Sequence, residues 1–237
     1  MLSRDDSVFL LDVDNTLLDN DRFGADLGAK LEQAFGSAGR DRYWSIYAAL
    51  RDELGYADYL GALQKFRDGV EDEPALLQMS AFLLDYPFAE RFYPHALEAI
   101  AHLRTLGRVA VFSDGDIVFQ PRKIQRSGIW DAVDGEVMIS VHKQRALPAM
   151  RQRFPARHYL MIDDKPQLLA AMKSALGERL GSVFVRQGHY AREADGVAID
   201  PPPDFSMDAI GDLLGSRFSD FLHASAPVAE AVQREAV

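Results

Sequence analysis

The chain contains no cysteine, which excludes disulfide bonds, thiolate nucleophiles and metal sites built on thiolates. It also lacks any apolar run approaching about 18 residues, so it offers no candidate for a membrane-spanning helix. The first residues show no basic segment followed by an apolar core, which is the pattern of a secretory signal. We therefore expect a soluble, unprocessed protein, and a cytoplasmic location agrees with the absence of cysteine.

Basic residues are in deficit, with 26 Lys and Arg against 36 Asp and Glu and a net charge of -10. Because nucleic-acid backbones are bound by clustered Lys and Arg, we do not expect a nucleic-acid partner. An anionic ligand would have to be attracted locally, by a metal ion and by individual basic residues. Glycine-rich phosphate loops, H-E-x-x-H and G-x-S-x-G are also missing, which removes many catalytic classes.

Short apolar segments recur along the chain and predict the strands of one sheet. Residues 8–11 are apolar on both faces, which is typical of a central strand in a parallel sheet. Similar segments follow at 108–112, 135–141, 158–162, 182–185 and 197–199, with helical patterns between most of them and a last helix at 206–222. We predict an α/β fold, a doubly wound, mainly parallel, Rossmann-like sheet with helices on both faces.

The stretch from residue 21 to residue 84 differs, because every periodic pattern in it is helical. Residues 40–54 place four large apolar side chains and Leu54 at spacings of three and four. Aromatic residues at such spacings are more typical of a helical core than of a ligand cage. We predict an all-α insert at 19–89, a core formed by 1–18 and 90–223, and a flexible tail at 224–237.

Two aspartates one residue apart follow the first predicted strand. Because side chains alternate along a strand, Asp12 and Asp14 should point the same way, with Val13 turned into the fold. Two carboxylates about 4 Å apart repel by about 4 kcal/mol at an effective dielectric near 20, so a proton or a divalent cation, best Mg²⁺, is expected between them. Capping of the following helix is an equal alternative. An EF-hand loop is excluded by Leu17 and Phe23 at its glycine and glutamate positions.

Two further predicted strands also end in polar residues. The strand at 108–112 leads into Ser113-Asp114, and the strand at 158–162 leads into Asp163-Asp164. The carboxyl ends of parallel strands face the ligand crevice in open α/β sheets, so these side chains are candidates for one site. Helix capping would account for the serine and for the paired acids equally well.

Basic residues suited to that site are few. Lys143 lies just ahead of a helical pattern, after His142, which we expect at the surface. Its rival is Lys123, which we predict to lie on a solvated helix face because Arg122 and Arg126 are near it. A loop after the strand at 182–185 offers further candidates for substrate contacts, although turn and packing roles fit them equally: Arg186, Gln187, His189 and Tyr190.

The segment D-V-D-N-T-L at 12–17 resembles the first signature of the haloacid dehalogenase-like hydrolase superfamily, most of whose members are magnesium-dependent phosphatases. Ser113, Lys143 and Asp163-Asp164 follow in the order of the other family signatures. Asp114 departs from the Asn or Gly that is commoner there. The resemblance implies that the helical insert is a cap that closes over the active site and selects the substrate.

The resemblance also implies roles for the candidate residues. Asp12 is then the nucleophile and Asp14 the general acid and base, while Ser113 and Lys143 bind the phosphate. Asp114, which adds negative charge near the pocket, is a candidate for contacts with water or substrate hydroxyls. Mg²⁺ is then held by Asp12, the Asp14 carbonyl and Asp164, with Asp163 acting through water; the choice between the last two stays open.

The expected function is hydrolysis of a small phosphorylated metabolite through an aspartyl-phosphate. Alternatives are a phosphomutase or phosphotransferase, a haloacid dehalogenase, which Asp14 disfavours, and a non-catalytic phosphometabolite-binding regulator. No motif in the helical insert specifies the substrate or the number of subunits.

Overall fold

The computed structural model describes residues 7–224, and its centre is a six-stranded parallel sheet in the order β3-β2-β1-β4-β5-β6. The order runs outward from β1 in both directions, as in a doubly wound fold. The predicted fold class is therefore confirmed. The strands are β1 (Ser7–Leu11), β2 (Arg108–Asp114), β3 (Val137–Ser140), β4 (His158–Asp163), β5 (Leu180–Val185) and β6 (Phe205–Met207).

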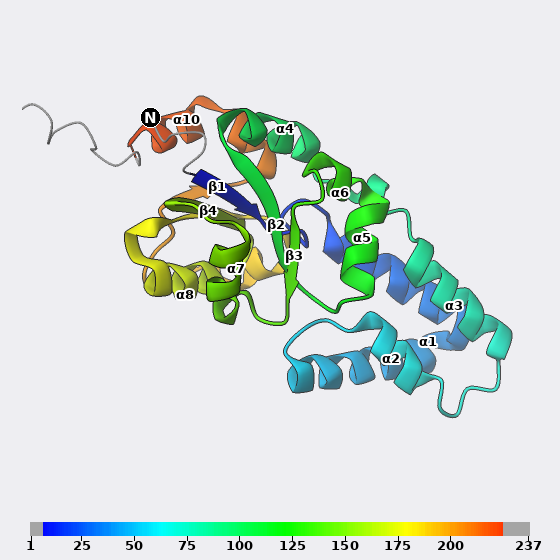
Figure 1. The fold of residues 1–237 in the computed structure, drawn as a ribbon. Coiled ribbons are helices and arrows are strands. Elements are labelled where there is room, and N and C mark those ends of the chain that lie inside the picture. The colour runs from blue at the N-terminus through cyan, green and yellow to red at the C-terminus, as the bar shows by residue number, and fades with distance from the viewer. Residues whose placement is uncertain (1–6, 225–237) are drawn as a thin grey trace, which may run out of the picture.

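Alternate side chains of each central strand enter two separate cores, one on each face of the sheet. In β1, Phe9 and Leu11 belong to the larger core, whereas Val8 and Leu10 belong to the smaller one. Figure 1 shows α4 and α10 on one side of the sheet and α7 and α8 on the other. The helices of the sheet domain are α4 (Ala96–Leu106), α5 (Phe119–Ser127), α6 (Ile129–Ala132), α7 (Leu147–Arg153), α8 (Pro166–Leu176), α9 (Gly188–Glu193) and α10 (Ser216–Ala224).

Between β1 and β2 the chain forms three helices that make a lobe of their own beside the sheet (Figure 1). They are α1 (Asn20–Leu54), which kinks at Gly36, α2 (Tyr59–Phe66) and α3 (Glu73–Asp85), and the short helix η1 (Phe88–Arg91) leads back to the sheet. Tyr43 and Phe66 are buried in ring contact with each other, as expected of a helical core. The all-α character of this segment agrees with the sequence prediction, whereas the exact domain limits stay a prediction.

Two local predictions near the C-terminus are wrong. Residues 197–199 form no strand, because Phe205–Met207 takes the hydrogen-bonding edge of β5 and Val197 is left exposed. The predicted helix at 206–222 is instead a short helix, η4 (Ile210–Leu214), followed by α10. The predicted tail at 224–237 begins at Ala224, the last residue of α10; its residues 225–237, like residues 1–6, lie outside the described residues.

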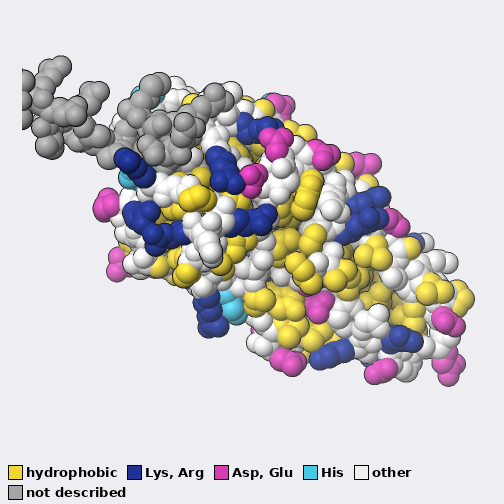
Figure 2. All heavy atoms as spheres, viewed as in Figure 1, with side chains coloured by type: hydrophobic (Ala, Val, Ile, Leu, Met, Phe, Trp, Pro, Cys, Tyr) yellow, Lys and Arg dark blue, Asp and Glu magenta, His cyan; other side chains and the backbone are white. Residues whose placement is uncertain are grey.

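The surface carries both signs of charge. Figure 2 shows acidic and basic side chains on both lobes of one face, with apolar side chains between them.

Within residues 7–224, no helix combines the length and the apolar character needed to cross a bilayer. The two remaining short helices are η2 (Lys143–Arg145) and η3 (Gly177–Arg179).

Candidate active site

The candidate residues meet because three neighbouring parallel strands end together. In the sheet register Leu11 of β1 lies opposite Val111 of β2 and Ile162 of β4, so the polar residues at the carboxyl ends of these strands share one edge. The backbone N–H of Asp12 donates to the carbonyl of Ile162 at 3.0 Å, which extends the pairing to the first aspartate. The hydroxyl of Ser113 lies 3.5 Å from Oδ1 of Asp12.

Lys143 lies in the middle of this edge. Its Nζ donates to Oδ1 of Asp12 at 2.5 Å and to Oδ2 of Asp163 at 2.6 Å, and the three side chains are buried. Burial alone would lower the pKa of Lys143, but the carboxylates of Asp12 and Asp163 outweigh it and hold this pKa above its ordinary value. Lys143 is therefore a fixed positive charge shared by two acids.

Asp114, expected near the phosphate, is engaged with the loop that carries this lysine. Its Oδ1 accepts the backbone N–H of Lys143 at 2.8 Å and the hydroxyl of Ser140 at 3.2 Å. The departure from the family pattern thus has a structural consequence, because the carboxylate fixes the backbone at the lysine.

The paired acids at the end of β4, Asp163 and Asp164, differ in their surroundings. Both carboxylate oxygens of Asp163 accept hydrogen bonds. Oδ2 accepts from Nζ of Lys143, and Oδ1 accepts from the backbone N–H of Lys165 at 2.9 Å. Both carboxylate oxygens of Asp164, and Oδ2 of Asp12, are buried without a hydrogen-bond partner among the described residues. Burial first, and then the charges of Asp163 and Asp12, raise the pKa of Asp164 well above its ordinary value.

These orphaned oxygens meet the requirements of a metal site. Asp12, Asp163 and Asp164 each offer a ligand atom within 4.8 Å of the others. Carboxylate oxygens are hard ligands that suit a cation such as Mg²⁺. A buried carboxylate without a partner is unfavourable unless a positive charge or a proton neutralises it. The cluster can therefore hold a metal ion, and both carboxylate oxygens of Asp164 are free of hydrogen bonds within the described residues. The carboxylate of Asp14 is not part of this group of ligand atoms.

The prediction that Lys123 lies on a solvated face is wrong. Its side chain is 1% exposed, and its Nζ lies 2.7 Å from Oδ1 of Asp14 and 2.9 Å from Oδ1 of Asn20. The reason is tertiary: α5 turns this side toward the helical lobe, whereas Arg122 and Arg126 point outward and pair with Asp85.

Sequence reasoning also missed Gln120, one turn before Lys123. Its amide Nε2 donates to the hydroxyl of Ser113 at 3.0 Å and to Oδ2 of Asp14 at 3.3 Å. The signal available in the sequence was the i, i+3 spacing of Gln120 and Lys123 on the helical pattern that comes next along the chain after Ser113.

A cavity of about 480 Å³ opens onto Asp14 and Asp114 between the sheet edge and the helical lobe. Its wall includes aromatic and basic side chains from α1 and α9: Trp44, Tyr47, Arg51, His189, Tyr190 and Arg192. His189 and Tyr190, two candidates for substrate contacts, therefore line the cavity beside Asp14. Gln187 is instead buried and bonds to the backbone of Thr16 and Ile210, and Arg186 lines a different cavity.

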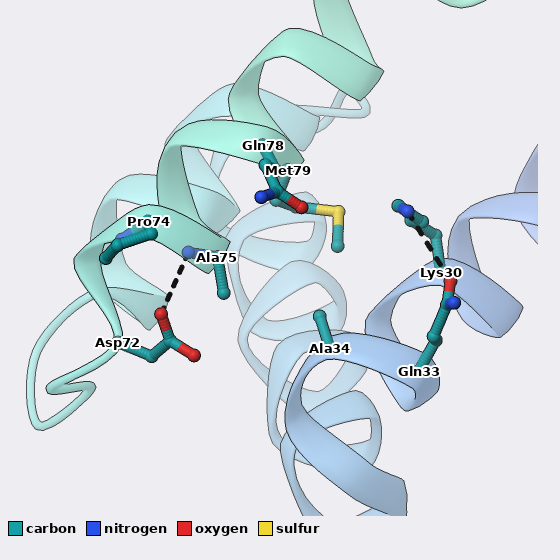
Figure 3. Close-up of a pocket in the computed structure, with 8 residues that line it drawn as sticks. All are labelled: Lys30, Gln33, Ala34, Asp72, Pro74, Ala75, Gln78 and Met79. Carbon is teal, nitrogen blue, oxygen red and sulfur yellow. Dashed lines mark hydrogen bonds between the residues drawn. The ribbon is translucent and has the colours of Figure 1, made fainter.

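A separate hollow of about 410 Å³ lies between α1 and α3 (Figure 3). Its carboxylate, Asp72, accepts the backbone N–H of Ala75 at 3.0 Å and so caps α3. Its ammonium, Lys30, lies beside Gln33. None of the predicted site residues lines it, so it offers no alternative active site.

A parallel sheet with buried acids and a buried lysine at its carboxyl edge defines an α/β enzyme site. A family model described as haloacid dehalogenase-like hydrolase matches residues 7–175. A solved structure from Burkholderia xenovorans LB400, assigned as a haloacid dehalogenase-like hydrolase, is 54% identical with a TM-score of 0.83, and the match covers 89% of this chain and 98% of that one. The chain therefore belongs to the haloacid dehalogenase-like hydrolases.

More distant structures share the fold. A haloacid dehalogenase-like family hydrolase from Xanthomonas campestris is 15% identical with a TM-score of 0.67, and the match covers 94% of each chain. A 2-haloacid dehalogenase from Pseudomonas syringae pv. Tomato DC3000 is 15% identical with a TM-score of 0.63, covering 93% of this chain and 99% of that one. No curated protein matches the sequence.

Proposed function

We propose that this hydrolase is a Mg²⁺-dependent phosphatase that cleaves a small-molecule phosphate monoester through an aspartyl-phosphate. The observation that carries the proposal is Asp12, whose Oδ1 is held by Lys143 while its Oδ2 is buried without a partner, beside two further acids. A carboxylate held on one side and unengaged on the other is suited to form a covalent intermediate.

In the proposed reaction a carboxylate oxygen of Asp12 attacks the phosphorus in line, and the bond from phosphorus to the leaving oxygen breaks. Asp14 gives a proton to that oxygen and later takes one from the water that hydrolyses the aspartyl-phosphate. Lys143 and the hydroxyl of Ser113 stabilise charge on the phosphoryl oxygens. An acid–base group of this kind typically contributes about 10² to 10⁴-fold to the rate.

The metal site is part of the same proposal. Asp12, the backbone carbonyl of Asp14 and Asp164 would hold Mg²⁺, which neutralises charge on the transferring group when bound. The contacts support Asp164 as the direct ligand, because Asp163 already accepts from Lys143 and from a backbone N–H. Asp163 would then act through water.

We further propose that residues 19–89 are a cap that selects the substrate. The cavity beside Asp14 takes part of its wall from this segment, including Trp44, Tyr47 and Arg51 of α1. The leaving group would contact these side chains while the phosphate contacts Ser113 and Lys143. Specificity would therefore depend on the helical lobe and chemistry on the sheet edge.

The test is a phosphate-release screen over sugar phosphates, nucleotides and small phosphorylated acids, with Mg²⁺ and then with chelator. We expect release from at least one class that disappears with chelator. Halide release from a 2-haloalkanoate is measured in parallel, and halide without phosphate would assign a dehalogenase instead. Transfer of the phosphate to a sugar hydroxyl rather than to water would assign a phosphotransferase, and ligand-induced stabilisation without turnover would assign a binding protein.

A further inference from the structure

Lys123 is buried at the junction of three parts of the fold and has no role in the reaction described above. It comes from α5, contacts Asp14 after β1, and contacts Asn20 at the start of α1. The side chain of Asp14 is 24% exposed and lines the cavity, whereas Lys123 is 1% exposed and lies behind it. The lysine therefore approaches the carboxylate from the protein side.

Aromatic rings enclose the ammonium. Its Nζ lies 5.3 to 5.9 Å from the ring centroids of Phe23, Tyr59, Phe88 and Phe119. Such distances are those of cation–π contacts, and the rings shield the charge from water. A buried ammonium must still find hydrogen-bond acceptors, because an unpaired charge in an apolar site is strongly unfavourable. Asp14 and Asn20 supply these acceptors, so the contact between Lys123 and Asp14 is structurally enforced.

Gln120 completes the arrangement from the same helix. Its amide holds Oδ2 of Asp14 at 3.3 Å while Lys123 holds Oδ1 at 2.7 Å. Both oxygens of the carboxylate are thus oriented by α5, and Gln120 also contacts Ser113, whose hydroxyl faces Asp12. The direction of the Asp14 carboxylate is set by two side chains behind it.

We propose that Lys123 is a positioning residue that fixes the Asp14 carboxylate toward the leaving oxygen of the substrate. The inference rests on the proposed role of Asp14 as acid and base. A reacting group displaced by about 1 Å can lose about 10²-fold in rate. Removal of the lysine should therefore slow the departure of leaving groups that need a proton, with little effect on substrate binding.

The test compares Lys123→Met with the wild type on two substrates, in the full-length protein with Mg²⁺. One is an alkyl phosphate from the screen, whose leaving group needs protonation; the other is p-nitrophenyl phosphate, whose leaving group departs as a stable anion. The ratio kcat/KM reports only the steps up to leaving-group release. We expect kcat/KM to fall about 10²-fold for the alkyl phosphate and only a few-fold for p-nitrophenyl phosphate.

Two further variants make the comparison specific. Asp14→Asn should show the same selective loss, and combining it with Lys123→Met should add little, because both act on one group. Arg122→Met removes the same charge from the same helix at a solvent-exposed position and should leave both substrates unaffected.

An equal loss on both substrates, or no loss, would overturn the inference while leaving the phosphatase proposal intact. A wild type that releases phosphate from no monoester would instead refute the phosphatase proposal itself. Should Lys123→Met fail to fold, the same kcat/KM comparison on the two substrates is made with Lys123→Gln, which keeps a hydrogen-bond donor. A larger loss on the alkyl phosphate again supports the inference, and an equal loss or no loss overturns it.

Discussion

Lys143 and Asp12 form an ion pair of 2.5 Å in which neither side chain is more than 3% exposed. The same ammonium contacts Asp163 but donates no hydrogen bond to Asp164, whose two oxygens are buried without a partner. A lysine placed in this way holds two acids of the cluster and leaves the third for another positive charge. The pair therefore links the stability of the folded chain to the chemistry at the sheet edge.

Replacing Lys143 by Met should destabilise the metal-free protein strongly. Breaking a buried ion pair by removing one partner leaves uncompensated charge and lowers the free energy of unfolding by about 3 to 5 kcal/mol. Urea denaturation in chelator measures this loss, and Arg122→Met is the exposed control. An unchanged denaturation midpoint in Lys143→Met would mean that the buried pair contributes nothing to stability.

Asp12→Asn should abolish turnover without unfolding the chain. The amide keeps the size of the carboxylate but cannot attack phosphorus, so phosphate release should fall at least about 10³-fold. Circular dichroism checks the fold, and Asp195→Asn, at an exposed position, serves as the control. Wild-type activity in Asp12→Asn would contradict the role of nucleophile.

Magnesium should stabilise the protein more as the pH rises. The folded, metal-free state keeps a proton on Asp164 between the ordinary value of 3.8 and its raised pKa, because burial and then the charges of Asp163 and Asp12 disfavour the carboxylate. The unfolded chain has lost that proton, so metal-free stability falls with pH through this window. A bound cation needs the ionised ligand, and its stabilising effect grows over the same range.

Thermal unfolding with and without Mg²⁺ from pH 5 to 8 measures this effect. At 100 times the dissociation constant a ligand stabilises by about 2.7 kcal/mol. Asp164→Asn should remove most of the magnesium-induced shift and its pH dependence. A shift of the same size at every pH would show that metal binding displaces no proton there.

Gly55→Ala should reduce activity through His142, the neighbour of Lys143. Gly55 ends α1 with a φ of +81°, and a Cβ there would clash with the imidazole ring of His142. Gly69 has a φ of +78° with nothing within 4 Å of its Cβ position, which makes Gly69→Ala a matched control for backbone strain. Both variants should lose about 1 kcal/mol of stability.

Only Gly55→Ala should also lower kcat/KM several-fold, since it alone displaces a side chain beside Lys143, the proposed phosphate-binding residue. Steady-state kinetics of the two variants on one phosphate monoester give the comparison. Equal kinetics in the two variants would show that the contact between the helical lobe and His142 does not influence the site.

Local patterns were sufficient for the sheet and for much of its polar edge. The apolar run of β1 predicts a central strand, and parallel strands that end together place Ser113 and Asp163 beside Asp12 without further information. The helices between residues 20 and 85 were also predictable from the sequence, because helical periodicity depends only on neighbours along the chain.

Long-range packing decided the rest. The sequence by itself determined where the acids fall along each strand, but the burial of Lys123 depends on rings from residues 23, 59, 88 and 119, which no local pattern brings together. Lys143, twenty positions before Asp163, donates to Asp163 and not to Asp164, so the oxygens of Asp164 are the ones left without hydrogen bonds. Charge and hydrogen-bond partners are properties of the assembled edge, so only the tertiary structure reveals them.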